Sequence, residues 1–244
     1  MHLMRSLRLG LLGAVALCAA VSTAASSAAV IKIGQTKTPM VAPACPTTGS
    51  CLIVVPKLTV LAVKSDGLTS PMAVKAQGEL VSFKVGVSAI NNDPKTARSE
   101  MLTENRRFGG PAEVELAVLQ RVGKKSRQKW SLVAHTPAYQ LDPYLGQVVE
   151  FPLAVPLPVV PGERVALTVP TWAPILSVNL MANKFSYVQS RATDCTKSAG
   201  TTPVTQAQLT FGQQSIFGCT YTGTRVQYGA LEITTPTPTS LKPK

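Results

Sequence analysis

Histidine, acidic residues and aromatic residues are scarce in this chain of 244 residues. Only two histidines are present, so catalytic triads and metal centres that depend on clustered histidine are not expected. The chain contains 12 acidic and 24 basic residues, which gives a formal net charge of +12. The small number of acidic residues disfavours carboxylate-rich calcium sites. Aromatic residues make up 5% of the chain, which is few for a protein that recognises sugars mainly by ring stacking.

Long apolar runs are missing as well. The run Leu9–Val21 has about 13 residues, whereas a membrane-spanning helix needs roughly 20, and no transmembrane segment is expected. This run follows two arginines and precedes the small residues Ser27–Ala29, which is the layout of a secretory signal peptide cleaved after Ala29. A leucine before Cys18 disfavours a lipid anchor. We therefore expect residues 1–29 to be a signal peptide and the mature protein, with a charge of about +10, to be secreted.

The positions of the few cysteines indicate disulfide bonds. One of the five lies in the leader, which leaves Cys45, Cys51, Cys195 and Cys219 in the mature chain. An even number of cysteines in an exported protein indicates disulfide bonds. Four cysteines allow three connectivities, and we expect the two local pairs, Cys45 with Cys51 and Cys195 with Cys219. The absence of a CxxC motif and the single mature histidine disfavour zinc, so neither a metal site nor a cofactor is expected.

What the chain does have is a recurring alternation of apolar and polar residues. The clearest segments are Glu79–Ile90, Val114–Val118, Trp130–Ala134 and Val165–Val169. A period of two with β-branched residues on the apolar side is typical of half-buried strands. Further strands are expected at Leu58–Lys64, Phe151–Leu157, Leu176–Leu180, Phe185–Gln189, Leu209–Gln213 and Arg225–Ile233.

These short strands, separated by turn residues, predict an all-β domain over residues 30–233. We expect a two-sheet antiparallel β-sandwich that is jelly-roll-like. Pro152, Pro156 and Pro158 lack a backbone N–H and should confine their segment to a sheet edge or an irregular crossing. Residues 234–244 are rich in proline and threonine and predict a flexible tail.

A long polar stretch, Asn91–Gly110, joins two of the expected strands. Connections of this length are uncommon unless they are functional or mobile. No long segment shows a helical period, and the best helix candidate is the short segment Arg98–Arg107. We therefore expect mainly a loop in this region.

Two segments carry a resemblance to known proteins. They are Trp130–His135, with the sequence WSLVAH, and the stretch VVPGERVALTVPTWAP that begins at Val159. Over roughly Gly78–Ile233 the chain resembles uncharacterised exported bacterial β-sandwich proteins. The resemblance implies a sandwich fold and brings with it no activity and no functional residues.

Candidates for catalysis are few. His135 is expected on the strand face opposite Trp130 and Leu132, as an ordinary polar residue, and no G-x-S-x-G motif supplies a nucleophile. Glu113 and Glu115 are two residues apart and so share a strand face, which could present the paired carboxylates that glycoside hydrolysis needs. Acids on a solvent-facing strand often have this spacing, and pairing with basic residues across the strands explains them equally well. We predict no catalytic residue and no enzyme.

Positive charge is the remaining signal. Five cations fall within nine residues at an expected hairpin tip, namely Arg121, Lys124, Lys125, Arg127 and Lys129. Three more lie in the preceding polar stretch, namely Arg98, Arg106 and Arg107. If both groups project from one end of the sandwich, they form a patch for a polyanionic polysaccharide, a cell-envelope polymer or a lipid headgroup. Alternatively, the hairpin charges aid solubility and block edge-to-edge pairing. Nucleic acid is not expected, because the protein is exported and the patch lacks interleaved aromatic residues.

Three aromatic residues in expected loops, Tyr139, Tyr144 and Trp172, are candidates for stacking on sugars, although loop aromatics more often close the end of a sandwich. The interpretation that follows is a secreted, non-catalytic module that binds anionic or carbohydrate material of the cell envelope. The alternatives are a structural or adhesive envelope protein whose ligand is another protein, and a hydrolase.

Overall fold

The computed structural model describes residues 27–45, 53–123, 128–193, 195 and 206–236. The fold belongs to one unit that runs from Ala28 to Pro236. The remaining unit, formed by Met1–Ser27 and Thr237–Lys244, lies outside the described residues except for Ser27. The predicted signal peptide and most of the predicted tail therefore stay predictions.

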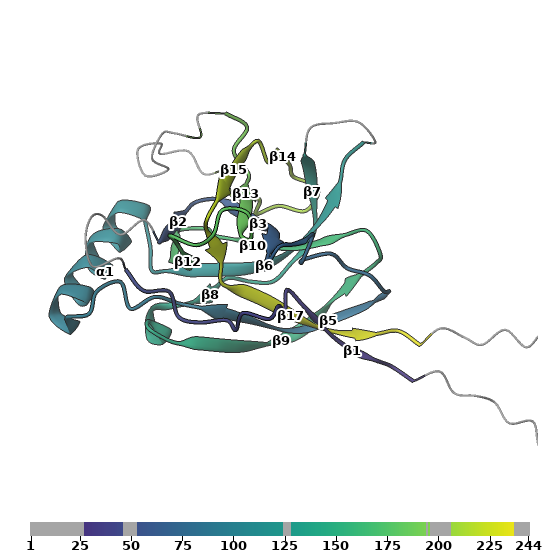
Figure 1. The fold of residues 1–244 in the computed structure, drawn as a ribbon, viewed down its shortest axis with the longest axis horizontal. Helices are drawn as coiled ribbons and strands as arrows, with labels where there is room; N and C mark the ends of the chain where they lie inside the picture. The colour runs from purple at the N-terminus through teal and green to yellow at the C-terminus, as the bar shows by residue number, and fades with distance from the viewer. Residues whose placement is uncertain (1–26, 46–52, 124–127, 194, 196–205, 237–244) are drawn as a thin grey trace, which may run out of the picture. The chain divides into compact units, whose positions relative to one another are not determined.

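A four-stranded antiparallel sheet forms one layer of the sandwich (Figure 1). In spatial order its strands are β1 (Val30–Ile33), β17 (Tyr228–Thr234), β5 (Gly78–Gly86) and β9 (Val148–Val159). The proline-containing strand β9 lies at the edge of this sheet, as its sequence predicts, because proline cannot donate a hydrogen bond to a second neighbour. At the opposite edge, Val30 pairs with Ile233, so the two ends of the unit are adjacent.

A nine-stranded antiparallel sheet forms the other layer. Its main path runs β14 (Gln214–Ile216), β7 (Lys129–His135), β6 (Glu113–Arg121), β10 (Arg164–Thr168), β3 (Thr59–Ser65), β13 (Ser186–Gln189) and β15 (Cys219–Thr222). Two short strands extend it: β4 (Leu68–Thr69) pairs with β3, and β8 (Tyr139–Gln140) pairs with β6.

Small elements complete the unit. Two further pairs of strands are β2 (Val54–Pro56) with β11 (Trp172–Pro174), and β12 (Leu176–Ser177) with β16 (Arg225–Val226). A 3-10 turn, η1, covers Asp142–Tyr144. The predicted strand at Leu209–Gln213 is wrong, because this segment is a turn held by side-chain hydrogen bonds and the strand follows it at Gln214–Ile216.

The predicted all-β, sandwich-like fold is confirmed, and the core lies between its layers. Phe83 of the small sheet and Leu116 and Leu167 of the large sheet are completely buried. Tyr228 of β17 reaches from the small sheet to the backbone of the large one. Its hydroxyl accepts a hydrogen bond from the Ala62 amide (3.2 Å) and donates one to the Val165 carbonyl (3.0 Å). The polar end of this buried ring is thereby satisfied, and the two layers are joined.

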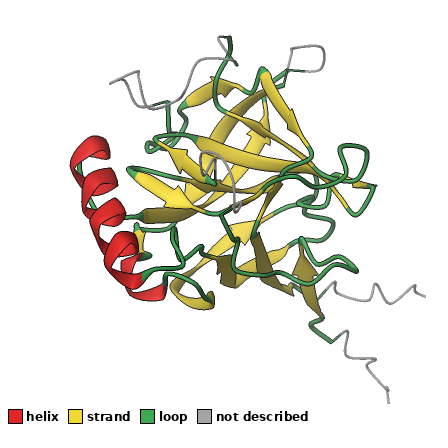
Figure 2. Cartoon of the chain, turned by 60° about the vertical axis from the view of Figure 1, so that its left-hand side comes forward, coloured by secondary structure: helices red, strands yellow, loops and turns green. Residues whose placement is uncertain are grey.

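In the polar stretch Asn91–Gly110 the expected loop is wrong, and the helix candidate Arg98–Arg107 is part of a longer helix. The stretch contains a 15-residue helix, α1 (Pro94–Phe108), which lies against the side of the β structure (Figure 2). Only Phe108 of this helix is buried, so the sequence has no apolar stripe from which to recognise it. The sequence nevertheless contains capping residues for both ends of the helix. Asp93 caps the first turn by accepting from the Thr96 amide (2.8 Å), and Gly109 ends the helix with a φ of 83°.

One of the two predicted disulfides is confirmed. Cys195 is bonded to Cys219. Cys45 is also disulfide-bonded, and its predicted partner, Cys51, lies outside the described residues. Among the described residues, no helix is long and apolar enough to cross a membrane.

Candidate functional site

One face of the large sheet carries the polar groups of interest. Along β6, Glu115, Leu119 and Arg121 alternate with residues of the opposite face, so they point to the same side. Directly paired residues of neighbouring strands share a face. Glu115 pairs with Thr168 of β10, and Arg121 pairs with Trp130 of β7. Leu119 pairs with Arg164 on one side and with Leu132 on the other. This side of the sheet is called the polar face below.

A pocket opens on the polar face where β6, β7 and β10 meet β3 and β13. It encloses about 270 Å³. The residues that line it are Leu61, Ala62, Val63, Ser70, Arg121, Gln128, Trp130, Gly162, Arg164 and Val188. Sites for whole drug-sized ligands typically enclose about 300–1,000 Å³. The pocket therefore suits one chemical group of a larger ligand.

Two guanidinium groups give this pocket its charge. Arg164 is half-buried at the start of β10, and its Nη1 donates to the Gly162 carbonyl (3.2 Å) and the Glu163 carbonyl (3.0 Å). Burial and, secondarily, the positive charge of Arg121 lower the pKa of Arg164 from its ordinary value. No carboxylate is among the described residues that line the pocket. The two cations therefore repel one another without a counter-charge from the lining.

Trp130 forms an aromatic wall of the pocket. The Cζ atom of Arg164 lies 5.9 Å from the centre of the Trp130 ring, within the range of a cation–π contact. Trp130 is 9% exposed, and its Nε1–H is buried without an acceptor among the residues that the structure describes. A buried donor without a partner costs roughly 1–3 kcal/mol. The pocket thus combines two positive charges with an aromatic wall.

The structure separates the two groups of cations that the sequence singled out. Arg121 lines the pocket and Lys129 begins β7, whereas Lys124, Lys125 and Arg127 lie outside the described residues. The other group, Arg98, Arg106 and Arg107, lies on α1.

Arg121 and Lys129, the described members of the hairpin group, lie at the opposite end of β6 from α1 (Figure 1). Helix α1 ends just before β6 begins, and the hairpin follows the last residue of β6. The nine residues of this strand span roughly 27–30 Å at about 3.3 Å each. The described cations therefore do not form the expected single patch. On α1, Arg107 instead forms an ion pair with Glu104 (3.7 Å) and stacks over Phe108.

Sequence reasoning did not single out Arg164, although a signal for it existed. Pro161 and Gly162 predict a turn just before the strand that begins at Arg164. In an antiparallel arrangement, the start of this strand meets the end of β6, where Arg121 lies. That pairing of β10 with β6 could not be read from local sequence.

The three candidate stacking aromatics are used inside the fold. Trp172 is completely buried. Tyr139 packs on Phe83 and Phe151, with ring centres 5.2 and 5.0 Å apart, and Tyr144 packs edge-on against Phe151 (5.3 Å). They close gaps in the sandwich, which corrects the suggestion that they present rings to a sugar.

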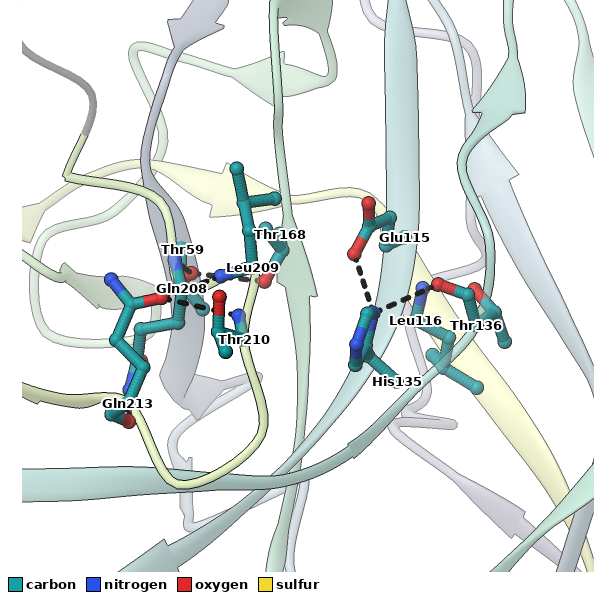
Figure 3. A network of polar contacts seen from close by, with 10 residues as sticks. All are labelled: Thr59, Glu115, Leu116, His135, Thr136, Thr168, Gln208, Leu209, Thr210 and Gln213. Carbon is teal, nitrogen blue, oxygen red and sulfur yellow. Dashed lines mark hydrogen bonds and ion pairs between the residues drawn. The ribbon is translucent and has the colours of Figure 1, made fainter.

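A second polar group on the same face is a glutamate–histidine pair (Figure 3). The Nδ1 atom of His135 lies 2.9 Å from Oε2 of Glu115 and 3.1 Å from the carbonyl of Thr136. Burial raises the pKa of Glu115, and the hydrogen bond and charge of His135 oppose that rise. Neither hydrogen-bond partner of His135 is a hydroxyl or a thiol. We assign no catalytic step to the pair.

The pair corrects two expectations. Glu115 is 8% exposed, so it does not lie on a solvent face opposite basic residues. His135 lies on the same face as Trp130 and Leu132, because the register between β6 and β7 shifts at Val118 and Leu119. A bulge inserts one residue and reverses the alternation beyond it, so simple period-two counting gives the wrong face.

These features define an all-β, sandwich-like fold with a basic pocket on the polar face of its larger sheet. No family model, curated protein or solved structure matches the chain. The functional argument therefore depends on the geometry of the polar face.

Proposed function

We propose that the protein is an exported, non-catalytic module that binds an anionic polymer of the cell envelope through the pocket of Arg121, Arg164 and Trp130. The observation that supports this most is the composition of the pocket. Two guanidinium groups and the indole of Trp130 line a space large enough for one acidic group. Arginine is well suited to carboxylate and sulfate, because its planar fork donates two parallel hydrogen bonds.

A polymeric ligand is favoured over a small anion by the positive charge of the chain. The chain carries a net charge of +12, and five basic residues occur within the nine residues 121–129. A polyanion can neutralise several of these charges while one of its acidic groups occupies the pocket. The same charges would increase the rate at which such a ligand associates at low salt.

Export is supported by the leader and the disulfides together. The signal-like residues 1–29 would direct the chain out of the cytoplasm. The Cys195–Cys219 disulfide is typical of proteins that mature in an oxidising compartment. An anionic polysaccharide of the envelope is a partner available there.

The proposal predicts that Arg121→Gln weakens the binding of an acidic polysaccharide by about tenfold, because a charge-assisted hydrogen bond contributes about 1.5 kcal/mol or more. Arg121 is exposed, so this change should leave folding intact. The measurement is a fluorescence titration of the mature protein with labelled oligogalacturonate at two salt concentrations.

Arg98→Gln is the matched control, since it removes the same charge from α1, which lies at the other end of β6. It should change affinity by less than about twofold. Equal losses for both variants would show that net charge alone governs binding and would contradict a role for the pocket.

A further inference from the structure

Phe211 is an unusually exposed aromatic side chain. It is 75% exposed and stands in the turn between Leu209 and Gln213. The Gln213 amide donates to the Thr210 carbonyl (2.9 Å), and Gly212 adopts a φ of 79° to close the turn. This conformation places Phe211 at the tip.

Two glutamine side chains fix this turn (Figure 3). Oε1 of Gln213 accepts from the amides of Leu209 (2.8 Å) and Thr210 (3.2 Å), and its Nε2 donates to the Ala207 carbonyl (3.1 Å). Nε2 of the completely buried Gln208 donates to the Gln213 carbonyl (2.8 Å). The backbone on both sides of Phe211 is thereby ordered in advance, and binding through its ring would lose little conformational entropy.

The same turn is attached to the strand that carries the pocket's tryptophan. The Gly212 amide donates to the Leu132 carbonyl (2.8 Å), and the Leu132 amide donates to the Gln213 carbonyl (2.9 Å). Gln208 Nε2 also donates to the carbonyl of Trp130 (3.1 Å). Gly212, the residue after Phe211, is thereby bonded to β7 two positions along the strand from Trp130.

We propose that Phe211 is the second contact of this binding site and stacks on a sugar ring of an acidic polysaccharide whose carboxylate occupies the pocket. This inference rests on the proposed function. The charge of Arg121 and Arg164 complements a uronic acid, and an aromatic ring complements the apolar face of the pyranose. The neighbours of Phe211 in the turn include Thr210 and Gln213, and one ring with polar neighbours suits one sugar face better than the interior of a bilayer.

The test compares two polyanions, oligogalacturonate and inorganic polyphosphate, of which only the first has sugar rings. Phe211→Ala should weaken oligogalacturonate binding about tenfold and leave polyphosphate binding within about twofold. Phe211→Trp should retain oligogalacturonate binding. The matched control is Leu102→Ala, which removes another exposed apolar side chain, on α1, and should change neither affinity.

Each other outcome overturns the inference. Unchanged oligogalacturonate binding by Phe211→Ala excludes stacking, and equal losses for both polyanions place the effect on the pocket instead. Loss of binding to phosphatidylglycerol vesicles alone would identify a lipid surface as the partner. Failure of the proposed function gives a different result, because Arg121→Gln would then weaken the binding of either polyanion no more than Arg98→Gln does.

Discussion

Removing the Cys195–Cys219 disulfide is expected to lower the free energy of unfolding by about 3 kcal/mol. The bond joins residues 24 apart, and closing a loop of this length restricts the unfolded chain by roughly that amount. Domain stabilities are typically about 5–15 kcal/mol, so the loss is a large fraction of the total. The measurement is urea denaturation of the Cys195→Ala/Cys219→Ala variant at neutral pH.

The variant should also loosen the β13–β15 edge of the large sheet. Tyr187 and Tyr221 stack there with ring centres 5.1 Å apart, and the Tyr221 hydroxyl donates to the Cys195 carbonyl (2.9 Å). A reduced near-ultraviolet tyrosine signal should therefore accompany the loss of stability. An unchanged urea midpoint would show that the disulfide does not measurably reduce the conformational freedom of the unfolded chain.

Replacing Trp172 by alanine should cost about 3–5 kcal/mol, the usual range for truncating a buried large aromatic side chain. Trp172 is completely buried in β11, and its Nε1 donates to Oδ1 of Asn105 (2.8 Å) and to the Gly110 carbonyl (3.2 Å). Asn105 lies on α1, which buries only Phe108 of its own residues. The indole is thus a principal connection between the helix and the sheet.

The Trp172→Ala substitution should consequently destabilise α1 more than it destabilises the sheets. The Trp172→Ala variant is expected to lose ellipticity at 222 nm before its strands unfold in urea. Trp172→Phe retains most of the apolar volume and loses the N–H, so its cost should be smaller, about 1–3 kcal/mol. A cost below 1 kcal/mol for the alanine variant would mean that α1 is held by other contacts.

Local sequence was sufficient for the fold class and insufficient for the site. Alternation identified most strands of both sheets, and proline placed β9 at an edge. Helix α1 was anticipated only as the short candidate Arg98–Arg107, because it is polar on nearly every side and its caps alone mark its full length. The prediction thus succeeded for strands, in which the burial of one face produces an alternation of apolar and polar residues. It failed for α1, which buries too few side chains to produce such a pattern.

The pocket depends on strand pairing, which local pattern does not contain. Arg164 and Trp130 are 34 positions apart in the sequence and meet because β10 and β7 both pair with β6. The face of His135 depends on a register shift that no residue type announces. Only Arg121 was identified in advance, through the charge of its segment.

The central claim is that an acidic group enters the pocket beside Trp130. The chain has two tryptophans, so a ¹⁵N-labelled sample gives two indole N–H signals, and Trp172→Phe assigns them. On titration with oligogalacturonate, we predict a progressive shift of the Trp130 signal and a stationary Trp172 signal. Saturated binding with an unmoved Trp130 signal would contradict the account.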